Sequence, residues 1–294
     1  MRCLWFVLLA CGVCGCAGRP ESGGSAAMSA DYASARASFQ TKLLRRGPSP
    51  EPASALHFSK LQRPRDVDEV EYVSGDLRLK AWTQAPPAAG GKPLPAVLFL
   101  HGGWGFDEGD WQHTRAFREA GYIVLAPMLR GENGCPGHFT MFYDEVDDVI
   151  AAGEHLAKLA NVDPERVYLA GYSAGGTLAM FGAMRSKRFR AVAALDGSPD
   201  RRRFIQGREQ EVPFDLRDAN ELRMRSPGEF PGSFQCPTRL YCSQDEGGYL
   251  DATRRLAQAA KSQGLDVEMV SVPGDHGTFR EPATKKAIAF FQQR

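Results

Sequence analysis

The spacing of hydrophobic residues changes along this chain and separates an early hairpin from a later series of strands and helices. Between residues 67 and 82, apolar and polar positions alternate around a Gly75-Asp76 turn, which is typical of a β-hairpin. From residue 96 onward, short continuous apolar runs alternate with stretches of helical spacing. Such apolar runs predict parallel strands that are buried on both faces.

The later pattern predicts six strands, at residues 96–100, 122–127, 166–171, 189–197, 238–243 and 266–272. Between and after them it predicts helices, at residues 113–120, 144–159, 177–184, 251–263 and 283–291. Strands that alternate with helices form βαβ units. We therefore expect an α/β fold with a mostly parallel central sheet, an antiparallel N-terminal hairpin and helices on both faces. Residues 201–234 are irregular and are expected to form a cap or lid.

The first residues differ from the rest. Arg2 precedes an apolar run that is too short for an ordinary transmembrane helix, which needs about 20 apolar residues. The run is typical of a secretory signal. "VCGC", ending at Cys16, resembles a bacterial lipoprotein signal, in which that cysteine becomes the acylated N-terminus; "LLAC", ending at Cys11, is a second candidate, and an ordinary cleaved signal is the alternative. We expect an exported protein, lipid-anchored at Cys16 and facing the periplasm or the cell exterior.

Composition narrows the function classes. The 294 residues are 43% hydrophobic and 24% charged, as in soluble globular proteins. The formal net charge of +1 gives no basic excess for nucleic acid, and the sequence contains no P-loop, GxGxxG or metal-ligand motif. After the leader, the three cysteines Cys135, Cys236 and Cys242 allow at most one disulfide and leave a free thiol.

One serine stands between two glycines where an expected strand meets an expected helix, in Gly171-Tyr172-Ser173-Ala174-Gly175. A serine hydroxyl is a poor nucleophile unless a base removes its proton. A sharp strand-to-helix turn exposes the hydroxyl, and its tight backbone favours glycine on both sides. This GxSxG pattern is typical of a nucleophile elbow. We predict that Ser173 is a nucleophile; the alternative is a flexible turn with an unreactive serine.

The order of the remaining polar residues fits a serine hydrolase. In α/β-hydrolases the acid and then the histidine follow the serine. His276 is the only histidine after Ser173 and follows the last expected strand, so we expect it to be the general base. Asp245 and Glu246 follow the strand at 238–243, and we prefer Asp245 as the acid that orients the imidazole. Weaker candidates are Asp196, Asp251 and Asp275.

A glycine turn supplies candidate donors for an oxyanion. "HGGWG", at residues 101–105, follows a buried strand, and its glycines let backbone N–H groups approach a developing negative charge. Each such donor contributes about 2.7–4 kcal/mol to transition-state stabilisation. We expect the backbone N–H groups of Gly103 and Ala174 to form the pair, with Trp104 as a further contributor. We interpret His101 as structural.

With these motifs in view, residues 67–294 resemble the α/β-hydrolase superfamily, and within it the prolyl oligopeptidase (S9) catalytic domain and the dienelactone-hydrolase-like branch. The resemblance lies in "HGGWG", "PMLRGENGCPG", "EVDDVIAAGEHLAKLANVDPERVYLAGYSAGG" and "GDHGTF". It implies a substrate-binding role for Arg130 in its Arg-Gly loop, and the alternative is a structural ion pair. Trp104 and Tyr172 are further substrate-binding candidates.

Two departures limit what the resemblance implies. Residues 17–66 are too few for the β-propeller that S9 oligopeptidases usually carry, and Ser173 stands where dienelactone hydrolases use cysteine. We divide the chain into a signal (1–16), a tether with an N-terminal helix (17–60) and an α/β-hydrolase catalytic domain (61–294).

The sequence thus predicts a serine hydrolase that acts on a small-molecule ester, amide or peptide through an acyl-enzyme. No metal or organic cofactor is required for that reaction. Carboxylesterase and S9-type peptidase remain equal alternatives. An inactive anchored binding protein and an acyltransferase are the competing hypotheses.

Overall fold

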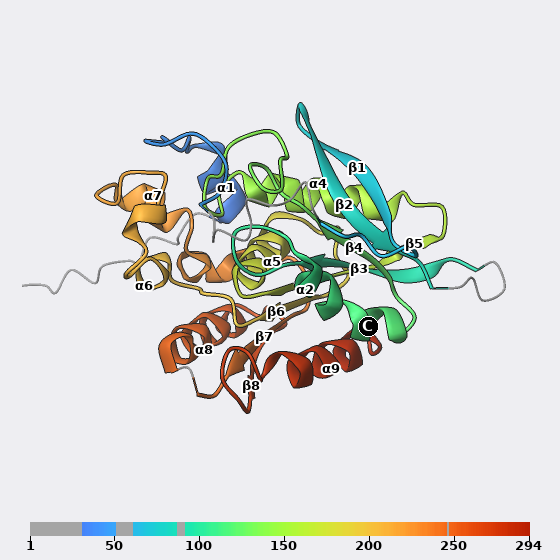
Figure 1. Cartoon of the computed structure of the whole chain (residues 1–294). Coiled ribbons are helices and arrows are strands. Elements are labelled where there is room, and N and C mark those ends of the chain that lie inside the picture. Colours follow the sequence, from blue (N-terminus) through green and yellow to red (C-terminus); the bar gives the residue numbers. More distant parts are fainter. Residues whose placement is uncertain (1–30, 51–60, 87–91, 246) are drawn as a thin grey trace, which may run out of the picture.

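The structure, a computed structural model, describes residues 31–50, 61–86, 92–245 and 247–294. Within them one sheet has the strand order β1-β2-β4-β3-β5-β6-β7-β8 (Figure 1). Its strands are β1 (Asp68–Ser74), β2 (Leu77–Gln84), β3 (Leu94–Leu100), β4 (Ile123–Pro127), β5 (Val162–Tyr172), β6 (Val192–Leu195), β7 (Thr238–Ser243) and β8 (Val267–Val272).

The expected fold class is confirmed. β1 pairs with β2, and β2 with β4, in antiparallel fashion, whereas every pairing from β4 to β8 is parallel. The predicted hairpin turns at Gly75, whose φ of 60° suits glycine. Because the strands from β4 to β8 run in the same direction, their carboxyl ends meet at one edge of the sheet, where ligands of open α/β sheets bind.

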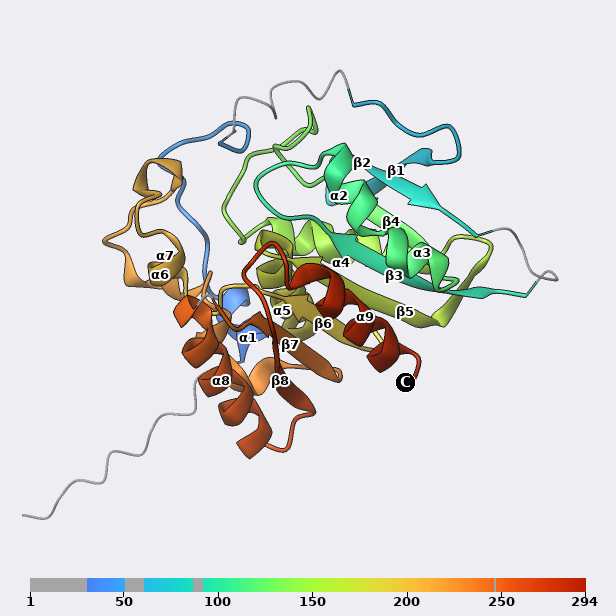
Figure 2. The same ribbon diagram turned by 60° about the horizontal axis from the view of Figure 1, so that its bottom comes forward.

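Helices cover both faces of this sheet. Their bounds are α1 (Tyr32–Ala37), α2 (Glu108–His113), α3 (Arg115–Glu119), α4 (Glu145–Ala157), α5 (Ala174–Arg185), α6 (Arg201–Phe204), α7 (Ala219–Arg223), α8 (Gly247–Ser262) and α9 (Arg280–Phe291). α3 and α9 pack together on one face, which comes forward in Figure 2, and α4 and α5 cover the opposite face. β3 to β6 are almost completely buried between these layers at their carboxyl ends.

In the segment where the sequence predicts an N-terminal helix, the structure has the six-residue α1. Within the described part, α1 ends at Ala37, and the following chain runs along the body to an isolated bridge between Leu43 and Phe214. The Tyr32 ring stacks on Phe181 at 4.7 Å, so this segment shares the core of the sheet domain. Of the apolar residues after α1, Phe39 packs partly against the core, whereas Leu44 is exposed.

Residues 201–234 form α6, α7 and three short 3-10 turns, beside α1 in both views (Figures 1 and 2). Arg202 and Arg203 of the basic run are exposed, whereas Arg201 is completely buried. The three cysteines after the leader are free thiols. The leader, including Cys11 and Cys16, lies outside the described residues. In the described part, every helix is too short or too polar to cross a membrane.

Candidate active site

Ser173 stands at the sharp turn between β5 and α5. Its backbone has φ 56° and ψ −116°, a conformation that non-glycine residues rarely adopt. A Cβ at Gly171 would lie 2.1 Å from the Gly175 carbonyl oxygen, and one at Gly175 would lie 2.2 Å from the Leu100 carbonyl oxygen. Only glycine fits at these two positions. The motif therefore has the strained, tightly packed geometry that the predicted elbow requires.

His276 reaches this elbow from the loop after β8. Its ring stacks on the Tyr172 ring with centroids 4.8 Å apart, and the Tyr172 hydroxyl donates to the His276 carbonyl oxygen at 2.8 Å. Both contacts therefore tie His276 to the residue that directly precedes the predicted nucleophile. The His276 side chain is 31% exposed, so solvent reaches the site.

The carboxylate that meets His276 is Asp196, not the preferred Asp245. Asp196 Oδ2 lies 2.8 Å from His276 Nδ1 and also accepts from the Ser243 hydroxyl at 2.7 Å. The Ser243 backbone N–H donates to Asp196 Oδ1 at 3.0 Å. The Asp196 side chain is only 2% exposed. It is thus buried, fully oriented and aimed at the imidazole.

The expectation for Asp245 is corrected by its position. Its side chain is exposed, and its backbone N–H donates to the Gly274 carbonyl oxygen at 3.3 Å. β6 and β7 are parallel neighbours in the sheet, so their carboxyl ends lie at the same edge. Asp196 directly follows β6 and therefore reaches His276 from the strand next to the one that Asp245 follows. The chain beyond Ser243 instead turns towards solvent.

The other acidic candidates have different surroundings. Glu246 lies outside the described residues. Asp251 lies inside α8 and pairs with Arg254 at 2.5 Å. Asp275 is exposed, and its carboxylate accepts backbone N–H groups of its own turn.

The expected oxyanion donors flank the nucleophile. Ala174 is the first residue of α5, and N–H groups in a helix's first turn have no acceptor within the helix. A Cβ at Gly102 would lie 3.4 Å from Ser173 Cβ, so the HGGWG turn packs directly against the elbow. Gly103, with φ 68°, and Ala174 line the same pocket. The arrangement fits the predicted pair.

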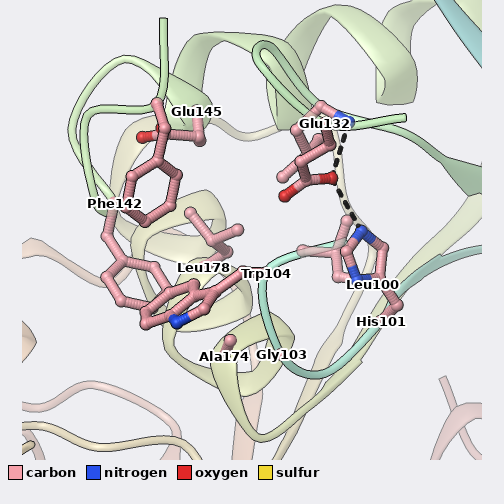
Figure 3. A pocket seen from close by; sticks show the side chains of 11 residues that line it. Leu100, His101, Gly103, Trp104, Glu132, Phe142, Glu145, Ala174 and Leu178 are labelled. Atoms are coloured by element: carbon pink, nitrogen blue, oxygen red, sulfur yellow. Dashed lines mark hydrogen bonds and ion pairs between the residues drawn. The ribbon is translucent and has the colours of Figure 1, made fainter. Parts of the chain in front are cut away.

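This pocket, which we call the acyl pocket, lies beside Gly103 and Ala174 (Figure 3). Its walls are formed by aliphatic, aromatic and acidic side chains, namely Leu100, His101, Trp104, Leu129, Glu132, Phe139, Phe142, Glu145 and Leu178. Trp104 contacts both phenylalanine rings, with centroids 5.0 Å from Phe139 and 5.4 Å from Phe142. The Trp104 indole N–H donates to Glu211 at 2.7 Å, which fixes the ring.

Sequence reasoning missed Phe139 and Phe142. Their loop shows no period, but it carries two consecutive strained residues, since Met141 and Phe142 have φ values of 55° and 68°. Such strain persists only where the surroundings enforce it, and it gathers at functional sites. The Arg201 guanidinium stacks on the Phe142 ring at 4.0 Å and adds to that enforcement.

Two buried acidic residues, Glu132 and Glu145, line the pocket. His101 Nε2 lies 3.0 Å from Glu132 Oε2. Burial alone would lower the pKa of His101. The Glu132 carboxylate outweighs that effect and raises the pKa of His101 to about 9. Burial raises the pKa of Glu145 to about 7, although Thr140 donates to its carboxylate. His101 therefore holds Glu132 in place, in agreement with its structural interpretation.

Arg130 does not reach the pocket. Its guanidinium binds Asp148 at 2.6 Å and 2.9 Å and lies 3.8 Å from Asp144. Asp148 is completely buried in α4. The geometry thus matches the alternative expectation, a structural ion pair that ties the loop after β4 to α4.

Comparison with known proteins identifies the family. A profile of the prolyl oligopeptidase family matches residues 110–293, more than half of the chain. The chain belongs to the prolyl oligopeptidase family. The probable dipeptidyl-peptidase 5 of Aspergillus clavatus is 28% identical over 155 residues, which cover 46% of this chain and 21% of that protein. The chain therefore spans about a fifth of the length of this curated relative of its family.

Solved structures agree on the fold of this prolyl oligopeptidase family member. The acylaminoacyl peptidase of Pyrococcus horikoshii superposes with a TM-score of 0.66 at 21% identity, over 83% of this chain and 44% of that chain. A protein from Klebsiella pneumoniae whose structure is titled "Putative Dienelactone Hydrolase" superposes with a TM-score of 0.58 at 18% identity, over 78% of this chain and 99% of that chain. These structural similarities show an α/β-hydrolase fold. Membership of a peptidase family supports a hydrolase activity for this chain.

Proposed function

We propose that this protein is a serine hydrolase that cleaves an ester or amide bond through an acyl-enzyme on Ser173. The observation that carries the proposal is the ordered set of contacts at the elbow. A strained serine precedes a helix N-terminus, the His276 imidazole stacks on the tyrosine directly before that serine, and the same imidazole is hydrogen-bonded to the buried Asp196.

In the proposed mechanism His276 acts as the base. An imidazole that donates from Nδ1 to a carboxylate carries its lone pair on Nε2, and this nitrogen takes the Ser173 proton. Asp196 holds that tautomer and stabilises the imidazolium. Ser173 Oγ then attacks the acyl carbon.

The backbone N–H groups of Gly103 and Ala174 stabilise the negative charge on the acyl oxygen. His276 returns the proton to the leaving group, which departs and leaves the acyl-enzyme. Water, activated by the same imidazole, then hydrolyses that ester and frees Ser173. The residues named account for each proton transfer.

The substrate class we propose is a small ester, amide or peptide. The Aspergillus and Pyrococcus proteins are named as peptidases, which favours a peptide bond as the substrate. The dienelactone-hydrolase neighbour, in contrast, superposes on this chain over 99% of its own length. The acyl pocket is narrow and mostly apolar, with a volume of about 10 Å³, so it favours a small acyl group.

An ester and an anilide of the same acyl group, N-acetylalanine, test the proposal. A peptidase hydrolyses both and an esterase only the ester, and Ser173→Ala abolishes either activity. Ser262→Ala, an exposed serine on α8, is the matched control and keeps wild-type rates. A folded wild type that hydrolyses neither and resists serine-directed reagents would favour an inactive hydrolase-fold binding protein.

A further inference from the structure

One wall of the acyl pocket is built on a strained loop. Phe139 and Phe142 belong to this loop, and their rings pack against Trp104 with centroids 5.0 Å and 5.4 Å away. Met141 and Phe142 have φ values of 55° and 68°, a region that non-glycine residues rarely adopt. A backbone in this conformation persists only where its surroundings enforce it. The contacts that hold the loop therefore also fix the position of the pocket wall.

Three of these contacts come from one buried carboxylate. Glu145 Oε1 accepts from the Thr140 backbone N–H at 2.5 Å. Glu145 Oε2 accepts from the Thr140 hydroxyl at 2.6 Å and from the Tyr143 backbone N–H at 3.0 Å. Thr140 and Tyr143 lie on either side of the strained pair of residues. Because Glu145 is only 2% exposed, water does not compete for these hydrogen bonds, and the carboxylate clamps the two ends of the strained segment.

Glu145 begins α4, but its carboxylate does not cap that helix. The backbone N–H groups of Val146 and Asp147, in the first turn, donate to the backbone carbonyls of Tyr143 and Asp144. The hydrogen bonds that the Glu145 carboxylate accepts come instead from the loop before the helix. Stabilisation of the helix end therefore does not explain the placement of this side chain, whereas control of the loop does.

Two arginines hold the same loop from residues 201–234. Arg225 Nε donates to the Thr140 carbonyl oxygen at 2.9 Å, and the Arg201 guanidinium stacks on the Phe142 ring at 4.0 Å. These contacts remain when the charge of Glu145 is removed. We therefore expect that loss of the carboxylate lets the wall move without unfolding the loop.

The position of the wall determines how large a group the pocket admits. The pocket has a volume of about 10 Å³, room for one group of the size of a water molecule. A methyl group has this size, whereas a longer alkyl chain does not fit. The pocket lies beside Gly103 and Ala174 and so adjoins the scissile carbonyl. Figure 3 shows Phe142 and Glu145 on the side of the pocket away from His101, where an outward shift of the wall would make room.

We propose that Glu145 is a positioning residue that limits the side chain beside the scissile carbonyl to the size of a methyl group. It does so by clamping the strained loop that carries Phe139 and Phe142. This inference rests on the proposed hydrolase function and adds the substrate class, which is esters or amides of alanine-like acyl groups. Glu145 acts through the loop and takes no part in proton transfer.

The test compares the thiobenzyl esters of N-acetylalanine and N-acetylnorvaline, whose side chains differ by two methylene groups. The kcat/KM for the alanine ester is expected to exceed that for the norvaline ester about tenfold or more, because the pocket has no room for the longer chain. A ratio of one or less overturns the proposal. A change in the amount of active enzyme alters both rates equally and leaves this ratio unchanged.

Variants locate the clamp. In Glu145→Gln an amide N–H₂ opposes a donor of Thr140 or Tyr143, so the loop loses a contact and the wall yields. The alanine-to-norvaline ratio is expected to fall about tenfold, mainly because the norvaline ester is hydrolysed faster. Glu119→Gln, at an exposed position of α3, is the matched control and keeps the wild-type ratio. An unchanged ratio in Glu145→Gln would mean that the carboxylate is only structural, and it would overturn the proposal.

A milder variant decides if Glu145→Gln fails to fold. Thr140→Val removes only the hydroxyl donor, and the ratio is expected to fall about threefold. An unchanged ratio in this variant also overturns the proposal. Fluorophosphonate labelling runs in parallel and separates this inference from the proposed function. A labelled enzyme without the alanine preference contradicts only the size limit, and an unlabelled, inactive protein contradicts both proposals.

Discussion

At the residue scale, the orientation of His276 depends on one buried carboxylate. Asp196 receives two hydrogen bonds from Ser243 and one from the imidazole, so its rotation is fixed before any substrate arrives. A third group that orients the base in this way sets its tautomer and stabilises the imidazolium. Replacing the Asp196 carboxylate by an amide keeps the shape of the side chain but removes its control over the His276 tautomer.

Asp196→Asn is therefore expected to lower kcat by about 10³–10⁴-fold, because the amide favours the wrong tautomer. Asp245→Asn, the matched control at an exposed position, is expected to stay within about threefold, as surface substitutions do. Steady-state hydrolysis of one activated ester measures both. A large loss in Asp245→Asn with little loss in Asp196→Asn would restore the acid that sequence order favours.

The sequence could single out Ser173 and His276 as candidates but not the carboxylate that contacts His276. The elbow has its own local pattern, and only one histidine follows it. The acid has no local pattern, and Asp196 and Asp245 both follow a buried strand in the correct order. Which of the two contacts His276 depends on the order of the strands in the sheet and on the two hydrogen bonds that Ser243 donates to Asp196. Both are properties of the tertiary structure.

His101 gives a pH prediction. Its pKa is raised from 6.5 to about 9, because Glu132 outweighs the effect of burial. The stabilisation is complete below about pH 6.5 and is lost as the pH rises through about 9. His101→Gln should thus lower the free energy of unfolding by about 3 kcal/mol more at pH 6 than at pH 10.

Urea unfolding at both pH values measures the His101 effect, with the exposed His138→Gln as control. The control is expected to change little at either pH. Equal losses for His101→Gln at pH 6 and pH 10 would mean that the Glu132 pairing does not stabilise the fold.

At the scale of elements, the segment with α1 behaves as part of the sheet domain. The Tyr32 backbone N–H donates to the Ser233 hydroxyl at 2.9 Å, and its ring packs between Phe181 and Phe230. Arg36 binds Asp147 of α4 at 2.7 Å. These contacts join α1 to three separate parts of the body.

Tyr32→Ala is expected to lower the free energy of unfolding by about 3–5 kcal/mol, as for other large aromatic residues removed from a core. Leu44→Ala, in the same segment, is 74% exposed and is expected to change it by about 0.5 kcal/mol or less. Denaturant unfolding of the two variants checks the difference. Similar small effects would show that the segment is a loosely attached tether.

The later strands and helices were predictable because periodicity reports burial directly. The loop at residues 138–143 was not, since Phe139 and Phe142 reach the pocket through a strained backbone rather than through a repeating pattern. Likewise, the sequence pattern gives no sign of the bridge between Leu43 and Phe214, a contact between segments far apart in the sequence.

At the scale of the whole molecule, the leader determines where the enzyme would act. We propose export and lipid anchoring at Cys16, which the apolar run and the "VCGC" motif support. Cys16→Ser is expected to move the protein from the membrane fraction of a bacterial host to the soluble fraction, because acylation is lost. Cys11→Ser is the control and should remain in the membrane. The reverse pattern would assign the anchor to Cys11.

The whole account depends on an activated Ser173 at the carboxyl edge of the sheet. Fluorophosphonate labelling of the folded protein tests it most directly, because the reagent reacts with a serine only where a base activates the hydroxyl. We predict that the wild type and Ser262→Ala become labelled, that Asp196→Asn is labelled far more slowly, and that Ser173→Ala is not labelled. A folded wild type that resists the reagent, or labelling that persists in Ser173→Ala, would contradict the account.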